Sequence, residues 1–167
     1  SYSIAHFSDF HLSESPVEFA RAVNLVRDAI SQGVDHIAIT GDVVETAQFP
    51  VFQRFWDCLC KLGWTSAEKM TFAPGNHDIF PASKRFPFCG PARPTTIFAR
   101  LCSLTRFSRT GRVVKILGDP YPVGKVLSPD VVLAALDTTR NGQYSPFRWA
   151  EGELDEDQRA AVSRFFA

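Results

Sequence analysis

The chain has 167 residues, of which 45% are hydrophobic, and its 18 basic residues balance its 18 acidic ones. This length suits a single domain over residues 1–167, and 15 Phe and 3 Trp are enough to fill one core. The composition excludes disordered and collagen-like chains. The net charge of zero argues against a protein dedicated to nucleic acid or to a membrane surface.

The cysteine spacing and the distribution of apolar residues indicate the cellular compartment of the protein. The four cysteines have neither paired C-x-x-C spacing nor the density of a disulfide scaffold, so we expect free thiols in a reducing compartment. The longest aliphatic run, Val131 to Leu136, is too short to span a bilayer, and no signal-peptide pattern opens the chain. We therefore expect a soluble, cytoplasmic protein with no membrane partner.

The first half of the chain alternates predicted strands and helices. A strand from Tyr2 to Ser8 precedes a helix that begins after Ser15 and ends at Gly33. Asp35 to Thr40 predicts the next strand, and this order is typical of a right-handed crossover in a parallel sheet. The pattern then repeats with a helix and a strand, over Pro50–Gly63 and Met70–Ala73.

The second half has fewer clear elements. Two β-rich runs, Val113 to Leu117 and Val131 to Leu136, are separated by a turn, and a last helix is expected from Asp155 through Phe166. Gln158 stands at the capping-box position of that helix. The sequence therefore predicts an α/β fold built on a parallel sheet.

Three polar clusters each follow a predicted strand directly. They are Asp9-Phe10-His11, Gly41-Asp42 and Gly75-Asn76-His77-Asp78. The carboxyl ends of parallel strands meet at one edge of a sheet, so we expect these clusters to converge. Carboxylate, imidazole and amide donors suit divalent Mn, Fe, Zn or Co. Two such ions about 3.5 to 4 Å apart, sharing Asp42, would activate a water for displacement at phosphorus.

Asp-x-His, Gly-Asp-x-x-Glu and Gly-Asn-His-Asp in this order resemble the calcineurin-like metallophosphoesterase superfamily, whose fold is a layered αββα sandwich. The resemblance implies that Asp9 and His11 bind the first ion and that Asp42 bridges both. It further implies that Asn76 binds the second ion and touches phosphate. His77 would then act beside the leaving oxygen and contact substrate, with Asp78 either orienting its imidazole, which we favour, or capping the next segment.

Gly-Asn-His-Asp, and no Arg-Gly after the second motif, make the chain more similar to the cyclic-nucleotide phosphodiesterase branch than to the protein phosphatases. The expected reaction is hydrolysis of a small phosphodiester by a metal-bridging hydroxide. The family's later histidine motifs do not occur, because the four histidines are His6, His11, His36 and His77. We therefore expect the N-terminal part of a sandwich, incomplete at its C-terminus, whose own activity depends on a missing C-terminal half.

Several further polar residues could serve either the structure of the fold or the metal site. For His6, Ser8 and Glu45 the structural role is favoured, with support of the metal ligands as the minority alternative. His36 is expected to be a solvated edge residue. Asp137 and Arg140 follow a predicted strand and could face the cleft, yet we expect neither to bind metal.

Two other functions stay open. A two-metal nuclease would use the basic segment from Lys84 to Lys115, in which aromatic residues alternate with cations as on single-strand platforms. Alternatively, that segment is a cap that attracts an anionic substrate, or an ordinary solvated insertion. In a third class, an inactive half-domain would act by association, because exposed apolar surface would promote self-association.

Overall fold

The computed structural model describes residues 1–45, 49–73, 75–79, 115–116, 121–138 and 152–167. Helices and strands alternate through the first half, and the described parts of the second half contain three strands followed by a helix. In chain order the elements are β1 (Ile4–Phe7), α1 (Pro16–Ser31), β2 (His36–Thr40), α2 (Phe49–Lys61), β3 (Met70–Ala73), α3 (Asn76–Ile79), β4 (Lys115–Ile116), β5 (Val123–Ser128), β6 (Val131–Ala135) and α5 (Glu156–Phe166).

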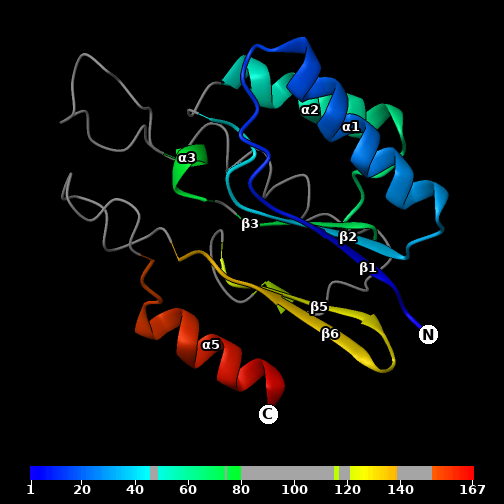
Figure 1. Cartoon of the computed structure of the whole chain (residues 1–167). Coiled ribbons are helices and arrows are strands. Elements are labelled where there is room, and N and C mark those ends of the chain that lie inside the picture. The colour runs from blue at the N-terminus through cyan, green and yellow to red at the C-terminus, as the bar shows by residue number, and fades with distance from the viewer. Residues whose placement is uncertain (46–48, 74, 80–114, 117–120, 139–151) are drawn as a thin grey trace, which may run out of the picture.

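The first sheet has the order β1-β2-β3, with both pairs parallel. α1 and α2 lie together on one of its faces, as Figure 1 shows. The buried core between these helices and the sheet includes Val26, Ile37, Ile39, Phe55 and Leu59, each no more than 1% exposed. The parallel sheet predicted from the strand and helix spacing is therefore confirmed.

Local sequence explains where α1 begins and ends. Ser15 caps its first turn by accepting a hydrogen bond from the Glu18 N–H, and Pro16 occupies the first helical position. Beyond the helix, Gly33 has φ of 77°, a left-handed conformation that glycine adopts without steric cost. These boundaries position the chain to enter β2 alongside β1.

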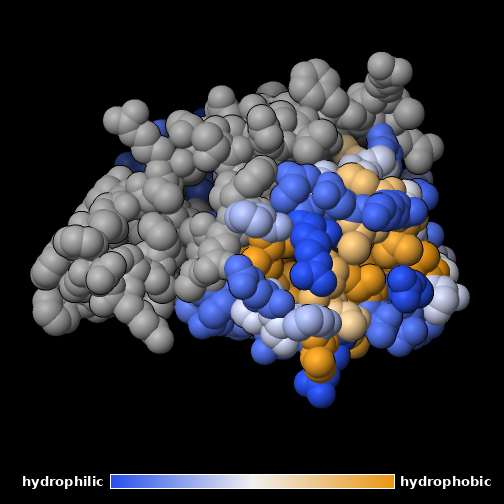
Figure 2. Space-filling model, turned by 90° about the horizontal axis from the view of Figure 1, so that it is seen from above, coloured by the Kyte–Doolittle hydropathy of each residue, from blue (hydrophilic) through white to orange (hydrophobic). Residues whose placement is uncertain are grey.

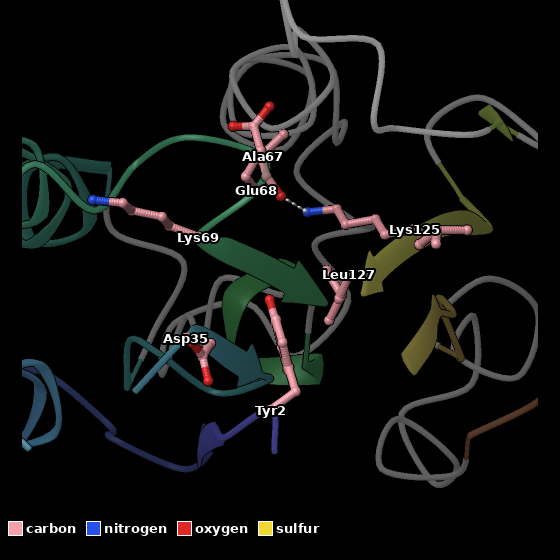
Figure 3. A pocket seen from close by; sticks show the side chains of 8 residues that line it. Tyr2, Asp35, Ala67, Glu68, Lys69, Lys125 and Leu127 are labelled. Atoms are coloured by element: carbon pink, nitrogen blue, oxygen red, sulfur yellow. Dashed lines mark hydrogen bonds between the residues drawn. The ribbon is translucent and has the colours of Figure 1, made fainter. Parts of the chain in front are cut away.

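The second sheet is antiparallel with the order β4-β5-β6, and it lies across the first sheet from the helices (Figure 1). Tyr121 donates its hydroxyl to the Phe72 carbonyl at 2.5 Å. Lys125 donates Nζ to the carbonyls of Ala67 at 2.9 Å and Met70 at 2.6 Å, and Figure 3 shows it reaching from β5 toward Ala67. These bonds join the two sheets at β3.

α5 covers the outer face of the second sheet, so the layers follow the order α, β, β, α (Figure 1). Gly124 of β5 makes this contact close, because a Cβ there would stand 2.7 Å from the ring of Phe165. At its start, Asp155 accepts a hydrogen bond from the Gln158 N–H at 2.7 Å. The layered α/β sandwich expected from the sequence is thus confirmed.

His36 overturns one expectation. It is fully buried in β2, where Nδ1 lies 2.7 Å from the Glu68 carbonyl and Nε2 lies 2.9 Å from the Thr71 hydroxyl. The prediction of a solvated edge residue is wrong because β2 is the central strand of the first sheet. Burial lowers the pKa of His36 to about 4, and the charge of Lys125 lowers it further, against the Glu68 hydrogen bond that raises it.

Two further observations concern the surface over α1 and α2 and the length of the helices. Figure 2 looks onto the face that α1 and α2 cover, where hydrophilic and apolar residues lie side by side. Val17 and Leu25 of α1 are among the exposed apolar side chains. Within the described ranges, no helix has the length and apolar character needed to cross a bilayer.

Candidate active site

The loops that leave β1, β2 and β3 meet at the carboxyl edge of the first sheet, with α3 beside them (Figure 1). The loop after β1 carries Asp9 and His11, and the loop after β2 carries Asp42. His77 follows β3 in the first turn of α3. A cavity of about 200 Å³ lies at the opposite edge, near Tyr2 and Lys125, and belongs to no part of this site (Figure 3).

Backbone hydrogen bonds join the first two loops like a short parallel ladder. Four bonds run between them: Asp9 N–H to the Gly41 carbonyl at 3.1 Å, His11 N–H to Asp42 at 2.9 Å, Leu12 N–H to Val43 at 2.9 Å, and Glu45 N–H to Leu12 at 3.0 Å. Leu12 and Val44 also form a parallel bridge. The ladder fixes the loop that carries His11 against the loop that carries Asp42.

Three predicted ligands share a rare backbone conformation. Asp9, His11 and Asp42 have φ of 56°, 46° and 51°, and they are the non-glycine residues with positive φ in the described part of the chain. Left-handed conformations cost such residues about 1 to 3 kcal/mol each and collect at functional sites. The ladder between the loops holds this strain in place, because each strained residue donates or accepts one of its bonds.

The donor atoms of these three residues lie close to one another. His11 Nε2 lies 3.9 Å from an Asp9 carboxylate oxygen and 4.0 Å from Asp42 Oδ2. Two ligands that bind one ion at about 2.1 Å stand at most about 4.2 Å apart, so both distances are compatible with a shared ion. All three donors lie within 4.8 Å of one another.

The third loop is tied to Asp42. The His77 N–H donates to Asp42 Oδ1 at 2.9 Å, which leaves Asp42 Oδ2 as the oxygen nearer His11. Gly75 approaches the same carboxylate so closely that a Cβ would overlap Asp42 and stand 2.8 Å from its Cγ. A glycine is therefore required for the third loop to reach the other two.

The rings of His11 and His77 meet edge to face, with their centroids 4.8 Å apart. His77 Nδ1 lies 2.7 Å from the carbonyl oxygen of Glu45. A carbonyl can only accept, so Nδ1 carries hydrogen and proton exchange takes place at Nε2. His77 thus stands beside the ligand cluster with the proton chemistry of an acid or base.

A comparison with known protein families decides the assignment. The sequence profile of the calcineurin-like phosphoesterase family matches residues 2–154. The chain belongs to this family. A search of curated proteins gave no significant match. Membership places the chain among metal-dependent phosphoester hydrolases, and the Asp9, His11 and Asp42 cluster provides metal-binding groups for that chemistry.

Within this calcineurin-like site, Asp78 is buried and holds the loops together. Its carboxylate accepts hydrogen bonds from the Val44 N–H at 3.1 Å and the Gly75 N–H at 3.0 Å. Burial raises its pKa to about 6 against these hydrogen bonds, and the charge of Asp42 adds to the rise. The structure therefore shows Asp78 joining the loops after β2 and β3, while the Glu45 carbonyl contacts Nδ1 of His77.

Other predicted residues lie elsewhere or outside the described part. Asn76 begins α3, but its side chain is outside the described residues, as are Arg140 and residues 84–114 of the basic segment. Asp137 is buried, and its N–H donates to Gln158 in α5. His6 contacts Thr40 at 2.6 Å.

Glu45, for which the sequence favoured a structural role, joins the site. Its carboxylate Oε2 lies 2.8 Å from His11 Nδ1. Its position three residues after Asp42 was the available signal, but the contact with His11 spans 34 residues of sequence and needs the ladder between the loops.

Proposed function

We propose that the protein hydrolyses a small phosphodiester of the cyclic-nucleotide type with two divalent ions. The observation that carries this proposal is the convergence of Asp9, His11 and Asp42 in strained conformations, beside the imidazole of His77. Asp9, His11 and Asp42 would hold the first ion. Asp42 and Asn76 would hold the second, with Asn76 also contacting the phosphate.

When bound, divalent ions neutralise phosphate oxygens and make a water nucleophilic near neutral pH. The residues of this chain position those ions and handle the proton. Asp42 is oriented by the His77 N–H, so its carboxylate is fixed before substrate arrives. When His77 is protonated on both ring nitrogens, it is placed to give the Nε2 proton to the departing alkoxide and to become neutral, while Nδ1 keeps its hydrogen on the Glu45 carbonyl.

The choice of a diester is supported by the motifs. Gly-Asn-His-Asp, together with the absence of Arg-Gly after the Gly-Asp-x-x-Glu motif, resembles the cyclic-nucleotide branch. Few nitrogen donors are available, since His6 contacts Thr40 and His36 is buried in the first sheet. We therefore expect the first ion, with Asp9, His11 and Asp42 as ligands, to bind more tightly than the second, for which Asp42 and Asn76 are the proposed ligands.

The substrate class is tested with the protein at the length its gene encodes, loaded with Mn²⁺. Initial rates are compared on an aryl phosphodiester, an aryl phosphomonoester, a cyclic nucleotide and single-stranded DNA. We expect the two small diesters to be cleaved fastest. Preference for the monoester would refute the diesterase proposal, and preference for DNA would establish the nuclease alternative.

The roles of individual residues are tested with two variants and a control. Asp42→Asn should abolish both Mn²⁺ binding and turnover, because it removes the shared carboxylate charge. His77→Ala should lower turnover by about 10² to 10⁴, the usual range for a lost acid or base, with metal content retained. Asp28→Asn on the exposed face of α1 makes the same change of charge and should match the wild type.

A further inference from the structure

Glu45 contacts both imidazoles of the site through two different groups. Its carboxylate Oε2 lies 2.8 Å from Nδ1 of His11, and its carbonyl oxygen lies 2.7 Å from Nδ1 of His77. The same residue donates its N–H to the Leu12 carbonyl at 3.0 Å, which anchors its backbone to the loop that carries His11. One residue therefore spans the loop of a predicted metal ligand and the side chain of the predicted acid.

These contacts determine the tautomer of each ring. A carbonyl oxygen and an ionised carboxylate accept hydrogen bonds only, so each Nδ1 must carry hydrogen. The lone pair of neutral His11 then lies on Nε2, the atom that faces Asp9 and Asp42. A free histidine side chain favours the opposite tautomer, with hydrogen on Nε2, which cannot bind a metal through that atom.

We propose that Glu45 is the positioning residue of this site, setting His11 by its carboxylate and His77 by its carbonyl. The effect of Glu45 on catalysis rests on the proposed function, whereas its effect on the two histidine tautomers can be measured in the metal-free protein. Acceptors that hold the second nitrogen of a ligating histidine orient the ring and raise its basicity, and their loss lowers metal affinity about 10- to 100-fold.

The distances argue against Glu45 as a ligand itself. Two ligands on one ion at about 2.1 Å stand about 3 Å apart or more, so the 2.8 Å between Glu45 Oε2 and His11 Nδ1 is a hydrogen bond and leaves no room for an ion between them. Nor is the pair a major source of stability. The Glu45 and His11 side chains are 53% and 36% exposed, and such pairs contribute about 0 to 1 kcal/mol.

The first test uses the metal-free protein, so its outcome does not depend on hydrolysis. Two-bond proton–nitrogen NMR spectra at pH 8 report the tautomer of each ring, and four histidines keep such spectra simple. We expect hydrogen on Nδ1 in both His11 and His77. Glu45→Ala should shift His11 toward the Nε2–H tautomer and leave His77 unchanged, because the carbonyl remains. An unchanged His11 tautomer in this variant overturns the proposal.

The second test measures Mn²⁺ affinity by calorimetry. Glu45→Ala should weaken binding about 10- to 100-fold. Glu45→Gln should restore the His11 tautomer and part of the affinity, because its amide oxygen still accepts a hydrogen bond. Glu14→Ala, which removes an exposed acid near the same loop, is the matched control and should bind as the wild type does. Equal affinities in the two alanine variants overturn the proposal.

A third result would also overturn the inference in favour of direct ligation by Glu45. If Mn²⁺ displaces the Nδ1 hydrogen of His11, and Asp42→Asn still binds the ion, the ion lies among His11, Glu45 and His77. Failure of the proposed function looks different: the tautomers follow Glu45 as expected, yet no phosphodiester is cleaved.

Discussion

Burial of a neutral histidine in β2 predicts that the protein loses stability in mild acid. His36 is fully buried with its pKa lowered from 6.5 to about 4, mainly by desolvation. Between these pH values the unfolded chain protonates position 36 and the folded chain does not. The unfolded state then binds more protons, so the free energy of unfolding falls as the pH falls.

The size of the effect follows from the pKa difference. Each pKa unit corresponds to about 1.4 kcal/mol, so the change from 6.5 to about 4 gives as much as about 3 kcal/mol between pH 7 and pH 4. That is a large fraction of the 5 to 15 kcal/mol typical of small domains. His36→Gln keeps a polar group near Thr71 without a titrating ring, so it should remove this part of the pH dependence.

The assay is urea unfolding followed by tryptophan fluorescence, since Trp56 and Trp64 lie in the first core. Wild type and His36→Gln are compared at half-unit steps from pH 4 to pH 8. The informative quantity is the difference between their free energies of unfolding. Groups that titrate in both proteins, such as Asp78, contribute equally to the two values and cancel in the difference. A difference that does not change with pH over this range would show that His36 is not a buried neutral group.

Two glycines give further predictions. Gly75→Ala should weaken Mn²⁺ binding, because the added Cβ would displace Asp42. Gly63 has φ of 71°, and a Cβ added there would meet no atom within 4 Å. Gly63→Ala should therefore lower the free energy of unfolding by about 1 to 3 kcal/mol through backbone strain and leave Mn²⁺ affinity unchanged. Calorimetry and urea unfolding separate the two, and equal affinity in both variants would refute the close-approach argument. Gly124→Ala should destabilise by about 1 to 3 kcal/mol by overpacking against Phe165, and Phe165→Leu should recover part of that loss if the clash is the cause.

Periodic patterning identified the elements that bury one face against the first sheet. The strand predicted over Met70 to Ala73 is β3 itself, and the helix predicted over Pro50 to Gly63 differs from α2 by only one or two residues at each end. β5 was missed because its sequence, from Val123 to Ser128, includes a glycine and a lysine. Lys125 can be buried because the carbonyls of Ala67, just before β3, and of Met70, in β3, accept its hydrogen bonds, and no local pattern reveals these contacts.

The site was predictable where residues follow strands and unpredictable where they reach across loops. Asp9, His11 and Asp42 directly follow β1 and β2, and the structure brings their donor atoms together. The contacts of Glu45 and Asp78 depend on hydrogen bonds that join residues more than 30 positions apart. Residue type and spacing therefore indicated where the chemistry lies, whereas the supporting contacts required the folded loops.

The left-handed backbone of Asp9, His11 and Asp42 connects the stability of the fold to its chemistry. Strain of about 1 to 3 kcal/mol at each position persists only where surrounding bonds determine the conformation. Here the ladder from Asp9 to Glu45 supplies those bonds, and the same ladder carries Glu45 to His11. The substitution Asp42→Gly would relieve the backbone strain at this position but would remove a carboxylate ligand. Stabilising substitutions of this kind in the two loops should therefore weaken metal binding. The backbone of the loops is accordingly part of the metal site, not merely its support.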